Sequence, residues 1–331
     1  MKKLLALALA ATMALSLAAC GGAKEEPAAP SEPATEAPAA ETYKVGICQL
    51  APHPALDAAT QGFIDALNEA LPGQVEFDNQ NAAGESATCA TIVNGFVSAD
   101  VDLIMANATP ALQAAVAATS DIPVLGTSVT EYGVALGIDN FSGTVGTNVS
   151  GTSDLAPLDE QAAMVKEWFP EAKTVGLLYC SAEANSQYQV DTVQAELEKL
   201  GLTCTQYPFS DTNDMSSVTQ NAVDNSDVLY VPTDNTCANN AGIIDNIARP
   251  AGVPIIAGEE GICGGCGVAT LSISYYDLGV ATGKMAAKIL TGEADIASMP
   301  IEYAPQFTKK YNETICTDLD LTVPEGYEAI A

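Results

Sequence analysis

The stretch Val101-Asp-Leu-Ile-Met-Ala-Asn-Ala-Thr-Pro110 decides the fold class. Its apolar residues form a short buried run, which is typical of a strand inside a parallel sheet. Pro110 then opens a helical pattern that continues to Ala118, because proline is favoured in the first turn of a helix. A strand, a polar strand end and a helix follow one another without a spacer, which indicates a βα unit.

The same alternation extends along the chain in both directions from this stretch. Short apolar runs predict further strands at 44–49, 74–79, 122–125, 174–179, 203–207, 228–231 and 254–257. Helical spacing of apolar residues predicts helices at 54–71, 86–99, 157–169, 184–200, 215–225 and 237–248. Two consecutive βα sets of similar size predict an α/β protein with two doubly wound parallel-sheet domains.

Two such sheets, facing each other, would create a cleft lined by their strand-end loops. Parallel sheets bind ligands at the carboxyl ends of their strands. Hinge closure of two domains around a ligand is an established use of this arrangement. We therefore expect a small-molecule site between the two domains.

The N-terminus has the features of an export signal. Met1-Lys2-Lys3 is followed by a Leu- and Ala-rich run, which is too short for a membrane span of roughly 20 apolar residues. Leu17-Ala-Ala-Cys20 resembles a bacterial lipobox, in which the Cys thiol receives a diacylglycerol. We predict a signal peptide at 1–19 and a lipid on Cys20, which would anchor the protein to the outer face of the cell membrane. An ordinary secretory signal with an incidental Cys is the alternative.

The segment 20–42 predicts a disordered linker, because it combines Pro and Glu with Ala and lacks large apolar residues. Such a chain cannot bury enough surface to offset its conformational entropy. Pro-rich segments of one charge sign stay extended. The linker would hold a folded domain away from the membrane.

The charge balance excludes several classes of partner. The formal net charge is −30, with 42 acidic and 12 basic residues. Nucleic-acid binding needs clustered Lys and Arg, so no nucleic acid is expected as a partner. Arg249 is the only arginine, which argues against a multiply anionic ligand.

Eight cysteines follow Cys20, and two interpretations of them stay open. An even number of cysteines in an exported chain permits disulfides, whereas a reducing milieu would leave small buried thiols. Cys263-Gly-Gly-Cys266 is expected in a loop, as a local disulfide or a loose metal site rather than a reactive redox pair. The remaining positions of these cysteines are Cys48, Cys89, Cys180, Cys204, Cys237 and Cys316.

Short motifs in a fixed order resemble those of one known family. They are Gln49 with His53-Pro-Ala-Leu-Asp57, Asn81-Ala82, Asp102-Leu-Ile104, Ala108-Thr-Pro110, Ile122-Pro-Val124, Gly151-Thr-Ser-Asp154, Glu183-Ala-Asn-Ser186, Thr233-Asp-Asn235 and Tyr275-Tyr-Asp-Leu-Gly279. The chain resembles the binding proteins of tryptophan/tyrosine-type ABC transporters, which have the type I periplasmic-binding fold. Two segments depart from the family pattern, Val129-Thr-Glu-Tyr132 and Cys263-Gly-Gly-Cys266.

The resemblance implies a hinge that the chain crosses three times. The crossings are expected near Thr152, Ile273 and Ala297. They would give one lobe made of 43–152 and 274–297, and a second lobe made of 153–273 and 298–331. The resemblance also implies a permease and an ATPase as partners, and an amino acid as the ligand.

Polar residues that follow the predicted strands are the candidate ligand contacts. Ala108 and Thr109 open a helix whose N-terminal amides would hold a ligand carboxylate, and Ser153 would add a hydroxyl. Asp154, Asp234 and Glu259 are the candidates to pair with an α-ammonium group, because a buried cation must be paired. Each of these residues could instead serve only as a helix cap or turn residue.

The other candidates come from the motifs of the resemblance. Gln49 and His53, the only histidine, flank the end of the first strand, and Asn185 with Ser186 begins a helix. Asn235 completes the set, following Asp234. The tyrosines Tyr132, Tyr275 and Tyr276 are expected either to stack on an aromatic ligand or to pack in the core or hinge.

The sequence thus predicts an extracytoplasmic solute-binding component of an ABC importer, whose ligand is an aromatic or other hydrophobic amino acid. The alternatives are a sugar or nucleoside as the ligand of the same fold, and a ligand sensor that reports to another membrane protein. We expect no catalytic residue and no cofactor. The chain has a single histidine and no Gly-x-Ser-x-Gly elbow for nucleophilic hydrolysis.

Overall fold

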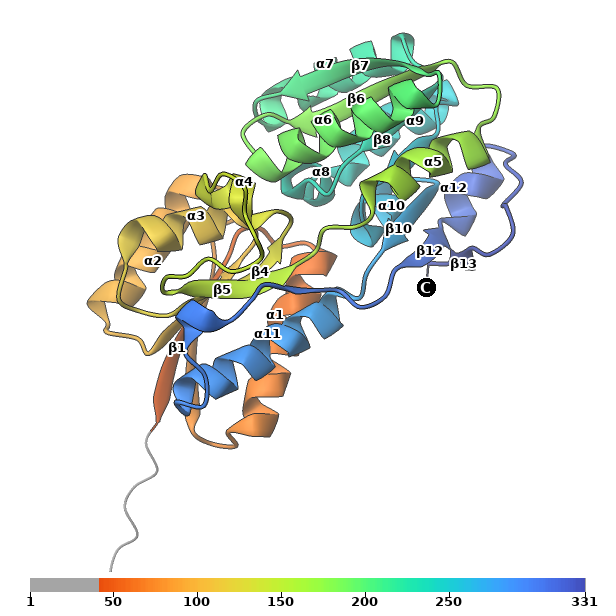
Figure 1. Ribbon diagram of the computed structural model, residues 1–331. Helices are drawn as coiled ribbons and strands as arrows, with labels where there is room; N and C mark the ends of the chain where they lie inside the picture. The colour runs from red at the N-terminus through yellow and green to blue at the C-terminus, as the bar shows by residue number, and fades with distance from the viewer. Residues whose placement is uncertain (1–41, 331) are drawn as a thin grey trace, which may run out of the picture. The chain divides into compact units, whose positions relative to one another are not determined.

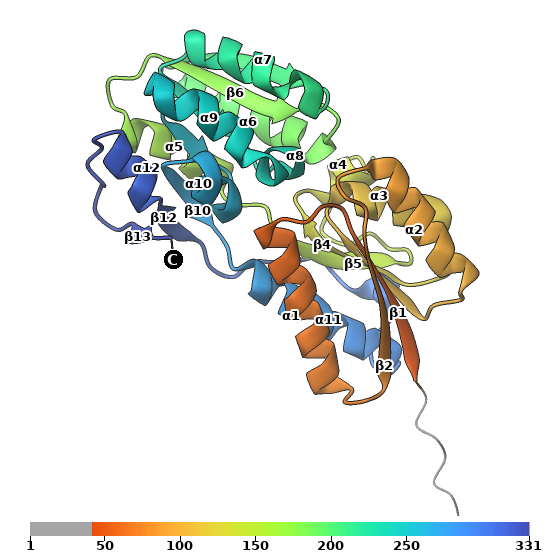
Figure 2. The same ribbon diagram turned by 180° about the vertical axis from the view of Figure 1, so that it is seen from behind.

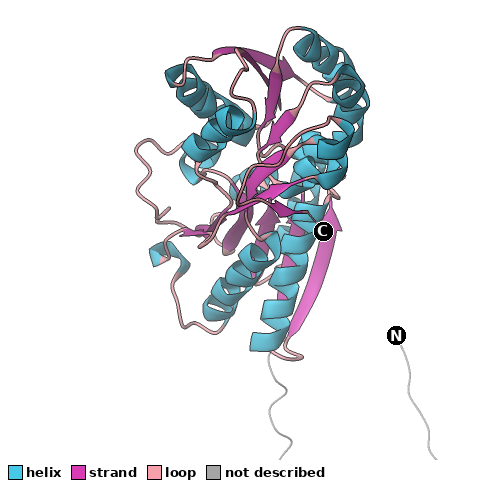
Figure 3. Ribbon diagram, turned by 90° about the vertical axis from the view of Figure 1, so that its right-hand side faces the viewer, coloured by secondary structure: helices cyan, strands magenta, loops and turns pink. Residues whose placement is uncertain are grey.

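The computed structural model describes residues 42–330. The predicted signal peptide, Cys20 and the predicted linker up to Glu41 lie outside the described residues. Two sheets, each between layers of helices, make up the described part of the chain (Figures 1 and 3). We call the first sheet with its helices the first lobe, and the second sheet with its helices the second lobe.

The sheet of the first lobe has six strands in the order β11-β5-β4-β3-β1-β2. Its strand pairs are parallel, and β1 lies between β2 and β3, where Val45 is opposite Phe77 of β2 and Leu103 of β3. The strands are β1 (Tyr43–Gln49), β2 (Val75–Asn81), β3 (Leu103–Asn107), β4 (Val124–Val129), β5 (Val149–Ser153) and β11 (Glu302–Tyr303).

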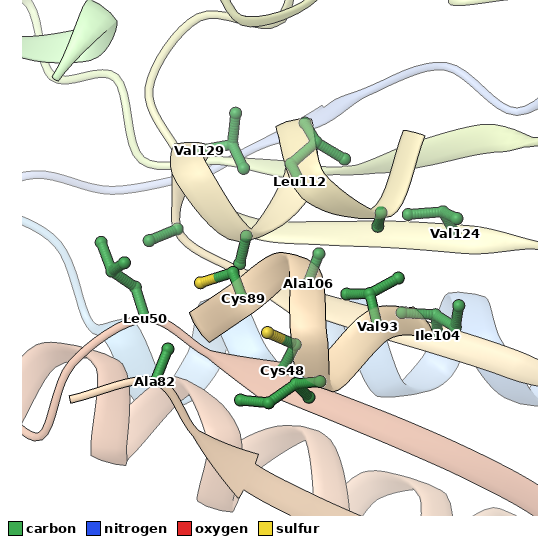
Figure 4. Packing of buried hydrophobic residues seen from close by; sticks show 14 of the residues in the cluster. Cys48, Leu50, Ala82, Cys89, Val93, Ile104, Ala106, Leu112, Val124 and Val129 are labelled. Carbon is green, nitrogen blue, oxygen red and sulfur yellow. The ribbon is translucent and has the colours of Figure 1, made fainter. Parts of the chain in front are cut away.

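Helices cover both faces of this sheet. On one face lie α2 (Ser86–Ser98) and α3 (Thr109–Ala118), and on the other lie α1 (Pro54–Ala70) and α11 (Tyr275–Leu290) (Figure 1). The core on the first of these faces includes Phe96 and Leu112, and Figure 4 shows part of it. The core on the other face includes Phe63 and Met285. A short helix, α4 (Tyr132–Leu136), follows β4.

The helices α1 and α11 lie side by side although they are far apart in the sequence (Figure 2). Two glycines permit this close approach. A Cβ atom on Gly62 would overlap the carbonyl oxygen of Tyr276, and one on Gly279 would overlap that of Ala59. The C-terminal part of the chain is thereby fixed to the first lobe.

The sheet of the second lobe has seven strands in the order β13-β12-β10-β9-β8-β6-β7. Only β12 runs antiparallel to its neighbour β10, and the other pairs are parallel. The strands are β6 (Thr174–Cys180), β7 (Thr203–Phe209), β8 (Val228–Val231), β9 (Ile255–Ala257), β10 (Ala269–Ser272), β12 (Thr308–Tyr311) and β13 (Glu328–Ala329).

Helices also cover both faces of the second sheet, over two separate cores. They are α5 (Leu158–Trp168), α6 (Ala184–Lys199), α7 (Thr212–Asp224), α8 (Asn235–Asn239), α9 (Ala241–Ala251), α10 (Glu260–Cys266) and α12 (Glu313–Asp318). Trp168 packs in this lobe, edge-on against Tyr327 with 5.1 Å between ring centroids.

The structure corrects two predicted elements of the second lobe. The helix predicted at 237–248 is divided at Asn240 into α8 and α9, because Asn240 leaves the helical conformation and its amide bonds back to Cys237. The segment of Cys263 and Cys266, predicted as a loop, is the helix α10. Glu259 caps this helix, which offsets the three glycines inside it.

The third crossing lies further along the chain than Ala297, where it was expected. The 3-10 helix η1 (Ile296–Ser298) and β11 still belong to the first lobe, where Glu302 pairs with Thr152 of β5. Ile301 is buried in the first-lobe core, and its amide donates to the carbonyl of Gly143. The chain therefore passes to the second lobe between β11 and β12. The other two crossings lie between β5 and α5, and between β10 and α11.

Candidate functional site

A small, largely enclosed cavity lies at the carboxyl ends of strands from both sheets. Its empty space is about 270 Å³, part of it open to solvent. The order of strands reverses between β1 and β3 in the first sheet and between β6 and β8 in the second, and ligands of open α/β sheets bind at such points. The cavity is lined by His53, Leu56, Ser128, Thr130, Asp154, Asn185, Thr233, Asp234, Asn235, Ala238, Glu259 and Tyr275.

Four polar atoms of these lining residues are buried without a hydrogen-bond partner. They are His53 Nδ1, Ser128 Oγ, Asp154 Oδ1 and Asn185 Oδ1. Each of the four residues is at most 5% exposed. Buried polar groups are almost always hydrogen-bonded, so their concentration around one cavity indicates a place for a polar ligand.

Asp154 has one carboxylate oxygen engaged and one free. The Tyr275 hydroxyl donates to Asp154 Oδ2 over 2.9 Å, whereas Oδ1 has no partner. Burial raises the pKa of Asp154, because its ionised form is held away from water. A cation placed at Oδ1 would offset this desolvation. Asp154 follows β5 at the first crossing and thus links the site to the hinge.

Asp234 and Glu259 line the cavity and also cap helices. Asp234 accepts from the amides of Cys237 and Cys180, which joins the start of α8 to the end of β6. Glu259 accepts from the amides of Gly261 and Ile262 at the start of α10. Burial raises the pKa of each carboxyl to about 7, against these amide bonds, which favour the ionised form.

His53 connects the two lobes at the cavity. It follows β1 in the first lobe, and its Nε2 lies 3.3 Å from Asn235 Oδ1 in the second. Burial lowers the pKa of the His53 ring, so the ring is neutral at pH 7. Glu183 orients Asn235 in turn by accepting from its side-chain amide over 2.7 Å and from its backbone amide. Because Asn235 Oδ1 is an acceptor, the neutral ring carries its proton on Nε2 and offers Nδ1 to a ligand as a single acceptor.

The cavity wall carries acidic groups and no lysine or arginine among its described lining residues. Three carboxyl groups, on Asp154, Asp234 and Glu259, surround it. An ammonium group is the cation that fits such a wall, because a buried charge must be paired.

Six of the eleven predicted ligand contacts come together at the cavity, namely His53, Asp154, Asn185, Asp234, Asn235 and Glu259. The other five do not line it. Gln49 uses its side chain inside the first lobe, with Asp57, Thr60 and the carbonyl of Ala51. Ser153 donates to the carbonyl of Thr130, and Ser186 lies behind Asn185 at the start of α6.

Ala108 and Thr109 are buried at the start of α3 and do not line the cavity. The carboxylate site expected on these amides is therefore not part of the cavity wall. Instead, Ser128 and Thr130, at the end of β4, line the cavity from the first lobe. Ser128 has a φ of 53° at an irregularity of β4, and nothing in the sequence pattern signals this conformation.

The tyrosines predicted to stack or pack are distributed over three environments. Tyr132 is buried in the first-lobe core and donates to the carbonyl of Thr152. Tyr275 lines the cavity. Tyr276 is 42% exposed on α11, where its hydroxyl donates to Asp65.

The eight cysteines of the described residues are free thiols. The local disulfide expected between Cys263 and Cys266 is not present, and both residues lie buried on α10. No group of side chains within residues 42–330 has the arrangement of a metal site, so the alternative of a loose metal site is not supported there either.

Comparisons with known proteins give consistent results. A family model described as ABC transporter substrate binding protein matches residues 44–331. A relative from Clostridioides difficile (strain R20291), named tyrosine-binding protein, is 33% identical over 323 residues, which cover 97% of this chain and 93% of that protein.

Solved structures agree with these matches. An ABC domain from Streptococcus pneumonia in complex with L-Trp has a TM-score of 0.83 and 32% identity, over 88% of this chain and 100% of the other. A ligand-free, open substrate binding protein from Clostridium difficile has a TM-score of 0.67 and 37% identity, over 87% of this chain and 99% of the other. Within residues 42–330, no helix has the length and apolar character needed to cross a membrane.

Proposed function

Since the chain belongs to the substrate-binding proteins of ABC transporters, we propose that it captures an aromatic amino acid, tyrosine or tryptophan, for import. One observation carries this proposal: four unpaired buried polar atoms and three carboxyl groups surround one largely enclosed cavity at the strand ends of both sheets. The relative named for tyrosine and the related structure with L-Trp support the aromatic side chain.

The cavity wall suits the head group of an α-amino acid. The ammonium group would donate to Asp154 Oδ1 and Asn185 Oδ1, which are acceptors without a donor. The carboxylate would accept from Ser128 Oγ, and His53 Nδ1, an acceptor because Nε2–H donates to Asn235 Oδ1, would take the third ammonium proton. This assignment satisfies every unpaired atom of the wall with one zwitterion.

The proposed partners are those of an importer. Substrate-binding proteins of this family work outside the cytoplasm with an ABC permease and its ATPase. We place the lipid anchor on Cys20, after removal of a signal peptide at 1–19, with 20–42 as the tether. Lipid labelling of cells that express the wild type or Cys20→Ala tests this anchor. Label retained by the variant would refute it.

Catalysis is not part of the proposed function. The proteins that this chain resembles are substrate-binding proteins. His53 faces the amide of Asn235, and the cavity wall contains no cysteine among its described residues.

Isothermal titration of the purified protein against the twenty amino acids tests the proposed function. Tyrosine or tryptophan is expected to bind with a Kd of about 1 μM or below, and glycine and aspartate are expected not to bind. Binding of no amino acid, together with binding of a sugar or a nucleoside in the same assay, would replace the proposal.

A further inference from the structure

A wide groove lies next to the cavity. It holds about 1370 Å³ of empty space, part of it open to solvent. One wall is the start of α1, with Pro54, Ala55 and Ala58, and the opposite wall is formed by the start of α9 and by α10, with Gly242 and Gly264.

The groove and the cavity share part of their lining. Ala238, Glu259 and Tyr275 line both of them. These residues come from α8, from the cap of α10 and from the start of α11, so the boundary between the two spaces is made of three separate elements. A molecule whose one end occupies the cavity has the groove directly beside it.

The two spaces differ sharply in chemistry. Nine of the twelve residues that line the cavity are polar or charged. Most residues of the groove are small or apolar, and its charged side chains include Lys310 and Glu260, which pair with each other over 2.6 Å. A polar head group gains hydrogen bonds in the cavity. An apolar side chain makes no hydrogen bonds there, so the apolar groove accommodates it better.

We infer that the groove between α1 and α10 is the side-chain compartment of this site, and that it admits aromatic amino acids enlarged at the far end of the ring. This inference rests on the proposed function, because it takes the head group to occupy the cavity. The cavity alone has about 270 Å³ of empty space, whereas the groove has several times more and is open at its outer end.

Two glycines keep the groove wide on the side of the second lobe. A Cβ atom built on Gly242 or on Gly264 would meet no atom within 4 Å. The backbone there could carry larger side chains without a clash, so its glycines leave space that a ligand can use. Gly264 of Cys263-Gly-Gly-Cys266 thereby obtains a role in selecting the size of the ligand, whereas Gly265 permits the close packing of α10 against Ala241 of α9.

The test compares L-tyrosine with O-benzyl-L-tyrosine as titration probes. The wild-type protein is expected to bind the enlarged probe within tenfold of the Kd for tyrosine. Gly264→Phe places a ring in the groove from α10, and Ala58→Phe does so from α1. Each variant is expected to weaken O-benzyl-L-tyrosine at least tenfold more than it weakens tyrosine.

Gly95→Phe is the matched control, because Gly95 is also a helical glycine with open space around its Cβ position, but on α2 away from the groove. It is expected to change neither affinity. Thermal unfolding checks that each variant is folded. If Gly264→Phe does not fold, Ala58→Phe alone provides the comparison of the two probes.

Two outcomes overturn the inference and differ in what else they overturn. If the wild type binds tyrosine but rejects O-benzyl-L-tyrosine, or if both groove variants bind the two probes like the wild type, the side chain lies elsewhere and the proposed function stands. If the wild type binds neither tyrosine nor tryptophan, the proposed function fails together with the inference.

Discussion

Asp154 shows how a single carboxyl group can be held ready for a ligand. Its Oδ2 accepts from Tyr275, its Oδ1 has no partner, and its pKa is raised by burial. Asp234 differs, because both of its oxygens already accept backbone amides. The sequence offered both residues as candidates for an ammonium group, with Asp234 ahead of Asp154, and the hydrogen bonds instead favour Asp154.

Asp154→Asn is therefore expected to weaken tyrosine binding by about thirtyfold, or about 2 kcal/mol, the usual contribution of a charge-assisted hydrogen bond. Stability should be unchanged or slightly higher, because the variant removes a desolvated charge and keeps an acceptor for Tyr275. Titration and thermal unfolding measure the two effects. Asp121→Asn, at an exposed position outside the site, is the control. Equal affinities of the two variants would contradict the role of Asp154.

Gly151 is a residue whose backbone conformation no other residue adopts easily. Its φ is 146°, and a Cβ atom there would overlap the carbonyl oxygen of Gly126 and the hydroxyl of Tyr132. Gly151→Ala is expected to lower the free energy of unfolding by about 3 kcal/mol or more, from backbone strain and overlap together.

Gly95→Ala provides the opposite case for the same type of substitution. Gly95 is helical and has open space around its Cβ position, so alanine should raise the free energy of unfolding by about 0.5–1 kcal/mol. Denaturant unfolding of the two variants measures the difference. A Gly151→Ala protein as stable as the wild type would show that β4 and β5 can separate at no cost.

At the scale of elements, the strand ends and the helix starts that follow them build the site. α8 and α10 begin at Asp234 and Glu259, whose carboxylates accept the first amides of these short helices. The cap positions thereby place both carboxyl groups in the cavity wall. Capping and ligand binding use the same residues, and this is why the sequence pattern alone could not separate the two roles.

The elements also explain the state of the cysteines. Seven of the eight described thiols are buried, and Cys204 on β7 is partly exposed. Cys48 on β1 and Cys89 on α2 lie in the first-lobe core among aliphatic side chains (Figure 4). Thiols in such places act as small apolar groups and not as nucleophiles.

A maleimide reagent at pH 7 is accordingly expected to modify Cys204 first in the native protein, and slowly, since burial raises the pKa of this thiol to about 11. All eight should react after denaturation without a reductant. Peptide mass spectrometry assigns the sites. Cysteines that react only after reduction would show that disulfides are present, which is the other interpretation that the sequence left open.

At the scale of the whole molecule, the two lobes bring acidic groups from both sheets to one cavity. Asp234 and Glu259 have pKa values of about 7 when folded, against 3.8 and 4.5 as ordinary values. The folded state binds more protons than the unfolded state between these limits. The stability that these groups contribute is thus present below about pH 4 and is lost as the pH rises through 7.

A bound ammonium group should reverse this trend, because its positive charge, placed on Asp154 in the same cavity, favours the ionised forms of Asp234 and Glu259 that burial otherwise disfavours. Below pH 7 the ligand must displace a proton, so its affinity should fall about tenfold per pH unit for each proton released. From pH 8 to pH 5.5 the expected loss is about thirtyfold for one proton. Titration in buffers of different ionisation enthalpy measures both affinity and proton release. An affinity that is constant over this range would contradict the pairing.

Much of the molecule was predictable from local patterns. The eight strands predicted from apolar runs match strands of the structure, since a buried parallel strand has few alternatives for its side chains. The division of the helix at Asn240 and the helix over Cys263 and Cys266 were not predictable, because capping by Glu259 and contacts within the second lobe decide them.

The sequence by itself determined two doubly wound domains, an acidic chain and a set of polar residues at the strand ends, because periodicity and composition act locally. Only the tertiary structure decided which of these residues share a cavity. Gln49 and Ser153 bond within their own lobe, while Ser128 enters the wall through an irregular strand end. The tertiary structure also decided that the third crossing follows β11. This strand pairs with β5, and no local sequence pattern encodes a pairing between segments so far apart in the chain.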